Sequence, residues 1–209
     1  MSDLGFIHRF VPASDADQPI LLLLHGTGGN EDDLLDVGGT IAPGAALLSP
    51  RGRVLERGMP RFFRRLAEGV FDLKDLKLQT ALLAKFVTEA SLKYGFSPGK
   101  VIAVGYSNGA NIAGSVMLTD PQLLAGAVLF RPMVPFIPDS PPNLGSLAAL
   151  LSAGRRDPIV APEQTLKLAE IFESGGAEIS IHWHEGGHEL GNDDIAAARK
   201  WIERWRLTK

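Results

Sequence analysis

A serine between two glycines is the part of this sequence whose residue types most directly suggest chemistry. Ser107 stands in the stretch Gly105-Tyr106-Ser107-Asn108-Gly109. A glycine two residues before and two residues after a serine is typical of a sharp strand-to-helix turn that presents the hydroxyl to solvent, because the glycines remove side chains that would collide there. The following helix would also point its positive end at a developing oxyanion. The pattern predicts a nucleophile, the alternative being a serine that only caps the helix.

A serine hydroxyl needs a base that accepts its proton, and histidine is the usual one. The sequence offers five: His8, His25, His182, His184 and His188. The first two precede the serine and break the order serine, acid, histidine that goes with this turn. The next two alternate within an expected strand. The last follows two glycines that would let a loop carry the imidazole over the sheet, so we predict His188 as the base rather than an exposed loop histidine.

The acid that orients the base should lie between the serine and the histidine, at the end of a strand. Asp157 fits this position, because it follows an expected strand through Ala153-Gly154-Arg155-Arg156 and precedes Pro158. Asp120 resembles a helix terminator and Asp139 falls in a proline-rich loop. We predict Asp157 as the third member, while a turn carboxylate that only starts the next helix stays an alternative.

An oxyanion hole for such a serine takes one backbone N–H from the next residue and one from the loop after an early strand. These donors would be Asn108 and Thr27. Glycines at 26, 28 and 29 would allow that loop to approach a ligand closely, and His25 would hold the loop by hydrogen bonding rather than transfer protons.

A metal centre is a competing interpretation of the histidines. Two histidines on one strand face and a third nearby, His182, His184 and His188, could hold zinc. The serine turn already explains the need for one histidine, so we expect no metal and no cofactor.

The elements that must position these residues follow from hydrophobic patterning. Short apolar runs that alternate with amphipathic stretches predict strands and helices of a largely parallel sheet. The expected strands are Ile20 to Leu24, Leu47 to Ser49, Val101 to Val104, Ala125 to Phe130, Ala148 to Ser152 and Glu178 to Trp183. The expected helices are Leu78 to Tyr94, Ala110 to Leu118, Pro162 to Phe172 and Asp193 to Trp205. The segment from Arg51 to Leu76 has no clear period and is expected to be irregular.

The composition limits the class of protein. With 209 residues, 45% hydrophobic and 22% charged, the chain is expected to form one soluble domain over residues 1–209. A net charge of −3 gives no overall attraction to nucleic acid. There is no cysteine, which excludes a thiolate nucleophile. The first residues lack the pattern of a signal peptide and no apolar run is long enough to span a bilayer, so a cytoplasmic location is expected.

Four segments together resemble the phospholipase/carboxylesterase family of small α/β-hydrolases, which includes acyl-protein thioesterases and bacterial carboxylesterases. They are His25-Gly26-Thr27-Gly28-Gly29, Gly105-Tyr106-Ser107-Asn108-Gly109, Gly154-Arg155-Arg156-Asp157-Pro158 and Gly187-His188-Glu189. The resemblance covers nearly the whole chain and implies an α/β-hydrolase fold, with a mostly parallel central sheet and helices on both faces. Asn108 stands where the family often has glutamine, and Thr27 where thioesterase members commonly have leucine.

The resemblance also implies that the segment 52–73 covers the substrate. Four of its side chains, at Met59, Phe62, Phe63 and Phe71, could line an acyl or aromatic pocket or serve as plain packing. Six of the thirteen arginines fall between Arg51 and Arg65. They could attract anionic esters if they face one way, although a solvated surface run is the commoner arrangement.

We therefore predict a serine carboxylesterase that hydrolyses small or short-chain carboxylic esters through an acyl-enzyme. An acyl thioesterase or lysophospholipase is the nearest alternative, because the same residues serve any acyl leaving group. A non-catalytic binding module on the same fold is a further one. The expected partner is a small-molecule ester, with no nucleic acid, and a homodimer stays open.

Overall fold

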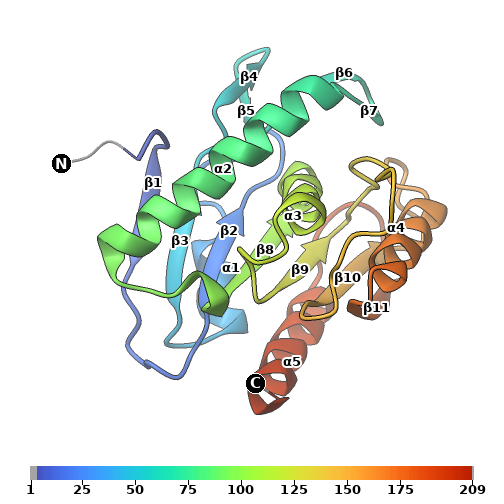
Figure 1. Cartoon of the computed structure of the whole chain (residues 1–209). Coiled ribbons are helices and arrows are strands. Elements are labelled where there is room, and N and C mark those ends of the chain that lie inside the picture. The colour runs from blue at the N-terminus through green and yellow to red at the C-terminus, as the bar shows by residue number, and fades with distance from the viewer. Residues whose placement is uncertain (1–3, 209) are drawn as a thin grey trace.

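A seven-stranded sheet forms the centre of the protein, whose computed structural model describes residues 4–208 (Figure 1). Its strands are β1 (His8–Val11), β2 (Ile20–Leu24), β3 (Ala46–Pro50), β8 (Val101–Tyr106), β9 (Gly126–Phe130), β10 (Ala148–Gly154) and β11 (Glu178–His184). The order across the sheet is β1-β3-β2-β8-β9-β10-β11. Only the β1–β3 pair within this sheet is antiparallel.

Helices cover both faces of the sheet (Figure 1). They are α1 (Leu35–Ile41), α2 (Leu73–Tyr94), α3 (Asn108–Thr119), α4 (Pro162–Ser174) and α5 (Asn192–Thr208), with a short 3₁₀ turn at Pro98–Lys100. Alternate residues of the central strands point to opposite faces, so each face has its own apolar core. In β2, for example, Leu22 and Leu24 pack with the residues of α2, α3 and α4, whereas Leu21 and Leu23 pack with those of α1 and α5. The predicted α/β-hydrolase fold is confirmed.

The helix α2 begins five residues earlier than its apolar period suggests. Asp72 caps it by accepting a hydrogen bond from the Asp75 N–H, and Gly95 ends it in the left-handed conformation. Leu73 itself is exposed, whereas Asp75 and Leu76 in the same first turn are buried. The capping side chain therefore marks the start of the helix, which the apolar spacing from Leu78 onward does not show.

The segment between β3 and α2 is more regular than expected. It contains two small hairpins, β4 (Val54–Glu56) with β5 (Met59–Arg61), and β6 (Arg65–Ala67) with β7 (Val70–Phe71). The expectation of an irregular stretch from Arg51 to Leu76 was wrong, because strands of two or three residues are too short to show a period of two. The strand β1 and the helix α1 also escaped prediction.

The connections place several loops at one edge of the sheet. Because β2, β8, β9, β10 and β11 run parallel, the loops that follow them meet at their carboxyl ends, where ligands bind in sheets of this kind. Within the described part of the chain, none of the helices combines the length and the apolar character that crossing a bilayer requires.

Candidate active site

Ser107 lies at the tip of the turn that joins β8 to α3. Its backbone has φ 52° and ψ −112°, a conformation that costs free energy for any residue with a side chain. The Ser107 N–H donates to the Phe130 carbonyl at 2.9 Å, which ties the turn to the neighbouring strand. A Cβ atom at Gly109 would overlap the Leu24 carbonyl, and one at Gly105 would meet the backbone of Ala110. Glycine is therefore required on both sides of the serine.

His188 bridges Ser107 and Asp157. Its Nε2 lies 2.9 Å from the Ser107 Oγ and its Nδ1 lies 2.8 Å from the Asp157 Oδ2. A carboxylate only accepts hydrogen bonds, so Nδ1 carries the proton and Nε2 is free to accept from the serine hydroxyl. The three residues come from the loops after β8, β10 and β11, and the Asp157 carboxylate is fully buried.

Asp157 uses its two oxygens for different purposes. While Oδ2 accepts from His188, Oδ1 accepts from the N–H groups of Ile159 at 2.8 Å and Val160 at 3.0 Å. The backbone turn thus fixes the carboxylate, and the carboxylate fixes the imidazole. A chain of this kind sets both the tautomer and the orientation of the histidine.

The predicted oxyanion donors lie beside the serine. Asn108 is the first residue of α3, so its N–H has no acceptor within the helix. Its side-chain Oδ1 accepts from the Phe62 N–H at 2.7 Å. The Thr27 hydroxyl accepts from the Arg61 guanidinium at 2.7 Å. Ser107, Asn108 and Thr27 line one cavity.

His25 holds the loop that carries Thr27. The Gly52 N–H donates to its Nε2 at 2.9 Å, which leaves Nδ1 to donate to the Gly26 carbonyl at 2.6 Å. Burial lowers the pKa of His25 below its usual 6.5. The neutral imidazole is the form that can accept from Gly52, so the site is built for an uncharged His25.

The four side chains predicted to bind substrate have different places in the structure. Phe71 lines the cavity beside Ser107, and Met59 is 40% exposed and lies over Gly28. Phe62 and Phe63, at 1% and 0% exposure, belong to the core. Their backbone instead serves the site: the Phe62 N–H binds Asn108, and the Phe63 carbonyl accepts from Arg61. Hydrophobicity alone could not separate these roles.

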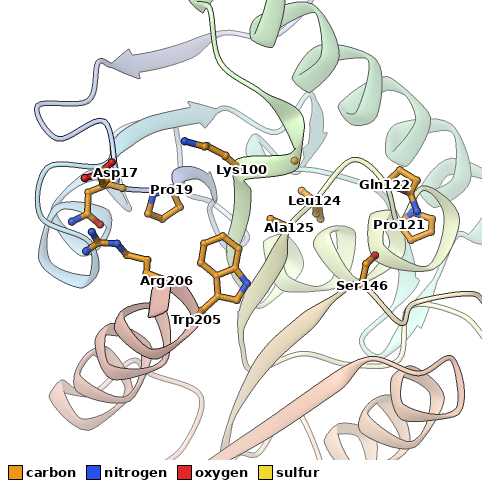
Figure 2. A pocket seen from close by; sticks show the side chains of 12 residues that line it. Asp17, Pro19, Lys100, Pro121, Gln122, Leu124, Ala125, Ser146, Trp205 and Arg206 are labelled. Carbon is orange, nitrogen blue, oxygen red and sulfur yellow. The ribbon is translucent and has the colours of Figure 1, made fainter. Parts of the chain in front are cut away.

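The cavity beside Ser107 is small, with a volume of about 40 Å³. Its wall also includes Asn111, Met133, Ile159 and Val160. A larger hollow, of about 510 Å³, lies at the opposite edge of the sheet, where Lys100, Ala125 and Trp205 are among its lining residues (Figure 2). That hollow is at the amino ends of the strands and is remote from the serine.

The arginines between 51 and 65 are mostly paired with carboxylates. Four of the six form ion pairs: Arg51 with Glu31, Arg61 and Arg65 with Glu56, and Arg64 with Asp72 and Asp75. Arg53 lies over the Phe6 ring. Of the six, only Arg61 and Arg65 line the cavity beside Ser107. These arginines therefore stabilise the two hairpins through ion pairs more than they give the entrance of the cavity a positive charge.

The three histidines considered as a zinc site do not converge. His188 contacts Ser107 and Asp157, whereas His184 donates from its Nδ1 to the Asp193 carboxylate at 2.9 Å. Among residues 4–208, the group that could reach one ion is His184, Asp193 and Asp194. In that group Asp194 is already engaged by a buried arginine.

Sequence reasoning missed the side chains that hold the histidine loop. Arg131 and Asp194 form a fully buried ion pair beside it, and the Tyr106 hydroxyl donates to the His188 carbonyl at 3.0 Å. The available signal was an arginine placed directly after the apolar strand run that ends at Phe130. A charge at the carboxyl end of a buried strand needs a partner, although the sequence does not say which one.

Comparison with known proteins gives consistent matches. A model of the phospholipase/carboxylesterase family matches residues 7–206. MhqD of Bacillus subtilis, which is named as a hydrolase, is 49% identical over 184 residues, covering 88% of this chain and 92% of that protein. The Bacillus cereus carboxylesterase structure is 43% identical with a TM-score of 0.92, covering 94% of this chain and 93% of the other. A carboxylesterase from Mesorhizobium loti is 32% identical with a TM-score of 0.91, covering 97% of each chain.

Proposed function

Since the chain belongs to the phospholipase/carboxylesterase family and is a serine hydrolase acting on esters, we propose that it cleaves small or short-chain carboxylic esters through Ser107, His188 and Asp157. The observation that carries the proposal is the continuous hydrogen-bonded chain from the Ser107 Oγ through both nitrogens of His188 to the buried Asp157. Nucleophile, base and orienting acid are then all within hydrogen-bonding reach.

The proposed reaction has two halves. The Ser107 Oγ attacks the ester carbonyl carbon while His188 Nε2 takes its proton, and the N–H groups of Thr27 and Asn108 stabilise the negative oxygen. The imidazolium then gives that proton to the departing alcohol oxygen, which leaves an acyl group on Ser107. In the second half, water loses a proton to His188 and attacks the acyl carbon, and the carboxylic acid leaves as the serine regains its proton.

The size of the cavity supports a small acyl group. A volume of about 40 Å³ beside Ser107 leaves little space for a long acyl chain. The relatives from Bacillus cereus and Mesorhizobium loti are named carboxylesterases, which favours oxygen esters. Thioester or lysophospholipid hydrolysis is the second candidate, because the same three residues can act on these groups.

Hydrolysis of a series of p-nitrophenyl esters tests the proposal. We expect kcat/KM to be highest for acetate or butyrate and to fall for longer acyl chains, and Ser107→Ala to abolish turnover while the circular dichroism spectrum is unchanged. Near wild-type turnover by Ser107→Ala would overturn the proposal. Faster turnover of palmitoyl thioesters or lysophospholipids would assign the second candidate function instead.

A further inference from the structure

The loop that carries His188 is held by an unusual set of hydrogen bonds. Four successive carbonyls, from Gly186 to Glu189, each accept from a donor elsewhere in the chain. The Gly186 carbonyl accepts from the Arg156 N–H at 3.0 Å, and the His188 carbonyl from the Tyr106 hydroxyl at 3.0 Å. Surface loops usually turn such carbonyls to water and keep conformational freedom. This loop has little freedom left.

Arg131 supplies the other two of these bonds. Its Nε–H donates to the Gly187 carbonyl at 3.1 Å and its Nη2 donates to the Glu189 carbonyl at 2.6 Å. One planar guanidinium therefore binds the backbone carbonyls on both sides of His188. Arg131 directly follows β9 and has φ 56°, and its N–H donates to the Ser152 carbonyl at 2.7 Å.

Asp194 orients the guanidinium from the opposite side. Its carboxylate accepts from Nη1 at 2.9 Å and from Nη2 at 2.7 Å, and both side chains are 0% exposed. It also accepts from the Gly191 N–H at 2.8 Å and from the Ser152 hydroxyl, which in turn accepts from Nη1 at 3.3 Å. All five guanidinium N–H donors thus have acceptors.

The energetics of this pair do not point to stability alone. Two charges lose their hydration when buried, and an apolar pair of similar size often folds equally well. Burial on its own disfavours the Asp194 carboxylate, but hydrogen bonds from Arg131 and Ser152 lower its pKa. An apolar pair, however, could not donate to the carbonyls of Gly187 and Glu189. The effect that only the ion pair provides is a fixed backbone conformation around His188.

We propose that Arg131, oriented by Asp194, and Tyr106 are positioning residues that hold the His188 imidazole against Ser107. The proposal rests on the proposed role of His188 as the base. Proton transfer needs heavy atoms roughly 2.6–3.2 Å apart, and a displacement of about 1 Å can cost a factor of about 100 in rate. A loop that contains Gly186 and Gly187 would not keep the imidazole within this distance range by its own backbone.

A variant with an apolar pair separates positioning from stability. Arg131→Met/Ser152→Ala/Asp194→Leu removes the charges and the hydroxyl that would lose its partner, and its matched control is Ser152→Ala. Ser152→Ala loses a hydroxyl whose single hydrogen is donated to Asp194. The hydrogen bonds from Arg131 to the carbonyls of the loop therefore remain. We expect similar thermal unfolding of the two proteins, but a kcat for p-nitrophenyl acetate roughly 100-fold lower in the triple variant with KM changed only a few-fold.

Two further measurements make the outcome decisive. The downfield proton NMR signal of the His188 Nδ1–H bonded to Asp157 should persist in Ser152→Ala and be lost or broadened in the triple variant. Tyr106→Phe, which removes one hydroxyl, should fold normally and lower kcat by about 5-fold to 30-fold, as expected for the loss of 1–2 kcal/mol. This variant decides the case if the triple variant does not fold.

A wild-type kcat in Tyr106→Phe would overturn the proposal. So would a folded triple variant that keeps the NMR signal and has the same kcat as Ser152→Ala. His188→Ala distinguishes this from failure of the proposed function. If His188→Ala is inactive while the positioning variants are fully active, only the positioning role fails. If His188→Ala keeps its activity, the assignment of His188 as the base fails.

Discussion

The serine turn and the histidine loop meet across the site but are held in place by different forces. Ser107 is fixed by close backbone packing of its turn against β2 and α3, which requires the glycines two residues before and after it. His188 is fixed by side chains that are distant in sequence. Arg131 lies 57 positions before it, and Tyr106 lies 82 positions before it. Local constraints can be recognised in a sequence, whereas the long-range ones emerge only from the fold.

The largest expected effect is on the turn. Gly109→Ala would place a Cβ on the Leu24 carbonyl, and neither backbone can move without disturbing the sheet. We expect the free energy of unfolding to fall by about 4 kcal/mol or more, measured by urea denaturation, with activity lost.

Gly39→Ala is the matched control for the turn. Gly39 is exposed in α1 and a Cβ there would have nothing within 4 Å, so the substitution should stabilise the protein by about 0.5–1 kcal/mol. Equal effects at the two glycines would show that steric crowding does not hold the turn.

The second effect is on the chemistry of the histidine. In Asp157→Asn, the amide oxygen can keep the bonds to Ile159 and Val160, while the amide N–H faces His188 and favours the wrong tautomer. We expect kcat to fall by roughly 10³–10⁴-fold with the fold retained, measured in steady-state kinetics. Asp120→Asn, at the end of α3, should be as active as the wild type. A strong loss in Asp120→Asn, with activity kept in Asp157→Asn, would reverse the assignment of the acid.

The third effect is on the oxyanion side. Arg61→Met removes the donors to the Thr27 hydroxyl and the Phe63 carbonyl, which should let the oxyanion loop shift. We expect kcat to fall by about 10-fold with little change in KM, because the lost contacts matter most in the transition state. The exposed Arg64→Met should leave kcat unchanged. A rise in KM alone would indicate that Arg61 contacts the substrate.

The smallest effect is on pH-dependent stability. Because the pKa of His25 is below 6.5 in the folded protein, the unfolded chain binds more protons between the folded and unfolded pKa values, and stability rises with pH there. The free energy of unfolding should therefore decline as the pH drops below 6.5. His25→Gln, whose amide oxygen can still accept from Gly52, should flatten this slope. An unchanged slope would remove His25 as its source.

The sequence predicted the parts of the molecule that depend on local order. Apolar runs predict six strands of the main sheet, and the glycines around Ser107 predict the turn. The chain order of serine, aspartate and histidine selected Asp157 and His188. In the structure His188 contacts both Ser107 and Asp157 by hydrogen bonds. Their catalytic roles stay proposals.

The remainder depends on pairing between distant segments. The hairpins of 52–73 are too short for a recognisable period, and the burial of Phe62 and Phe63 depends on how those hairpins dock. Arg131 is conspicuous in the sequence, but Asp194, 63 positions away, is one of many acidic residues until the fold brings the two together. A pattern of residue types cannot predict which charges pair in a core.

Covalent labelling of the serine tests the central claim most directly. We expect a fluorophosphonate to add one adduct per protein, mapped by mass spectrometry to Ser107, with no adduct in Ser107→Ala and much slower labelling in His188→Ala. An adduct on a different residue, or an unlabelled wild-type protein that still hydrolyses p-nitrophenyl acetate, would contradict the account.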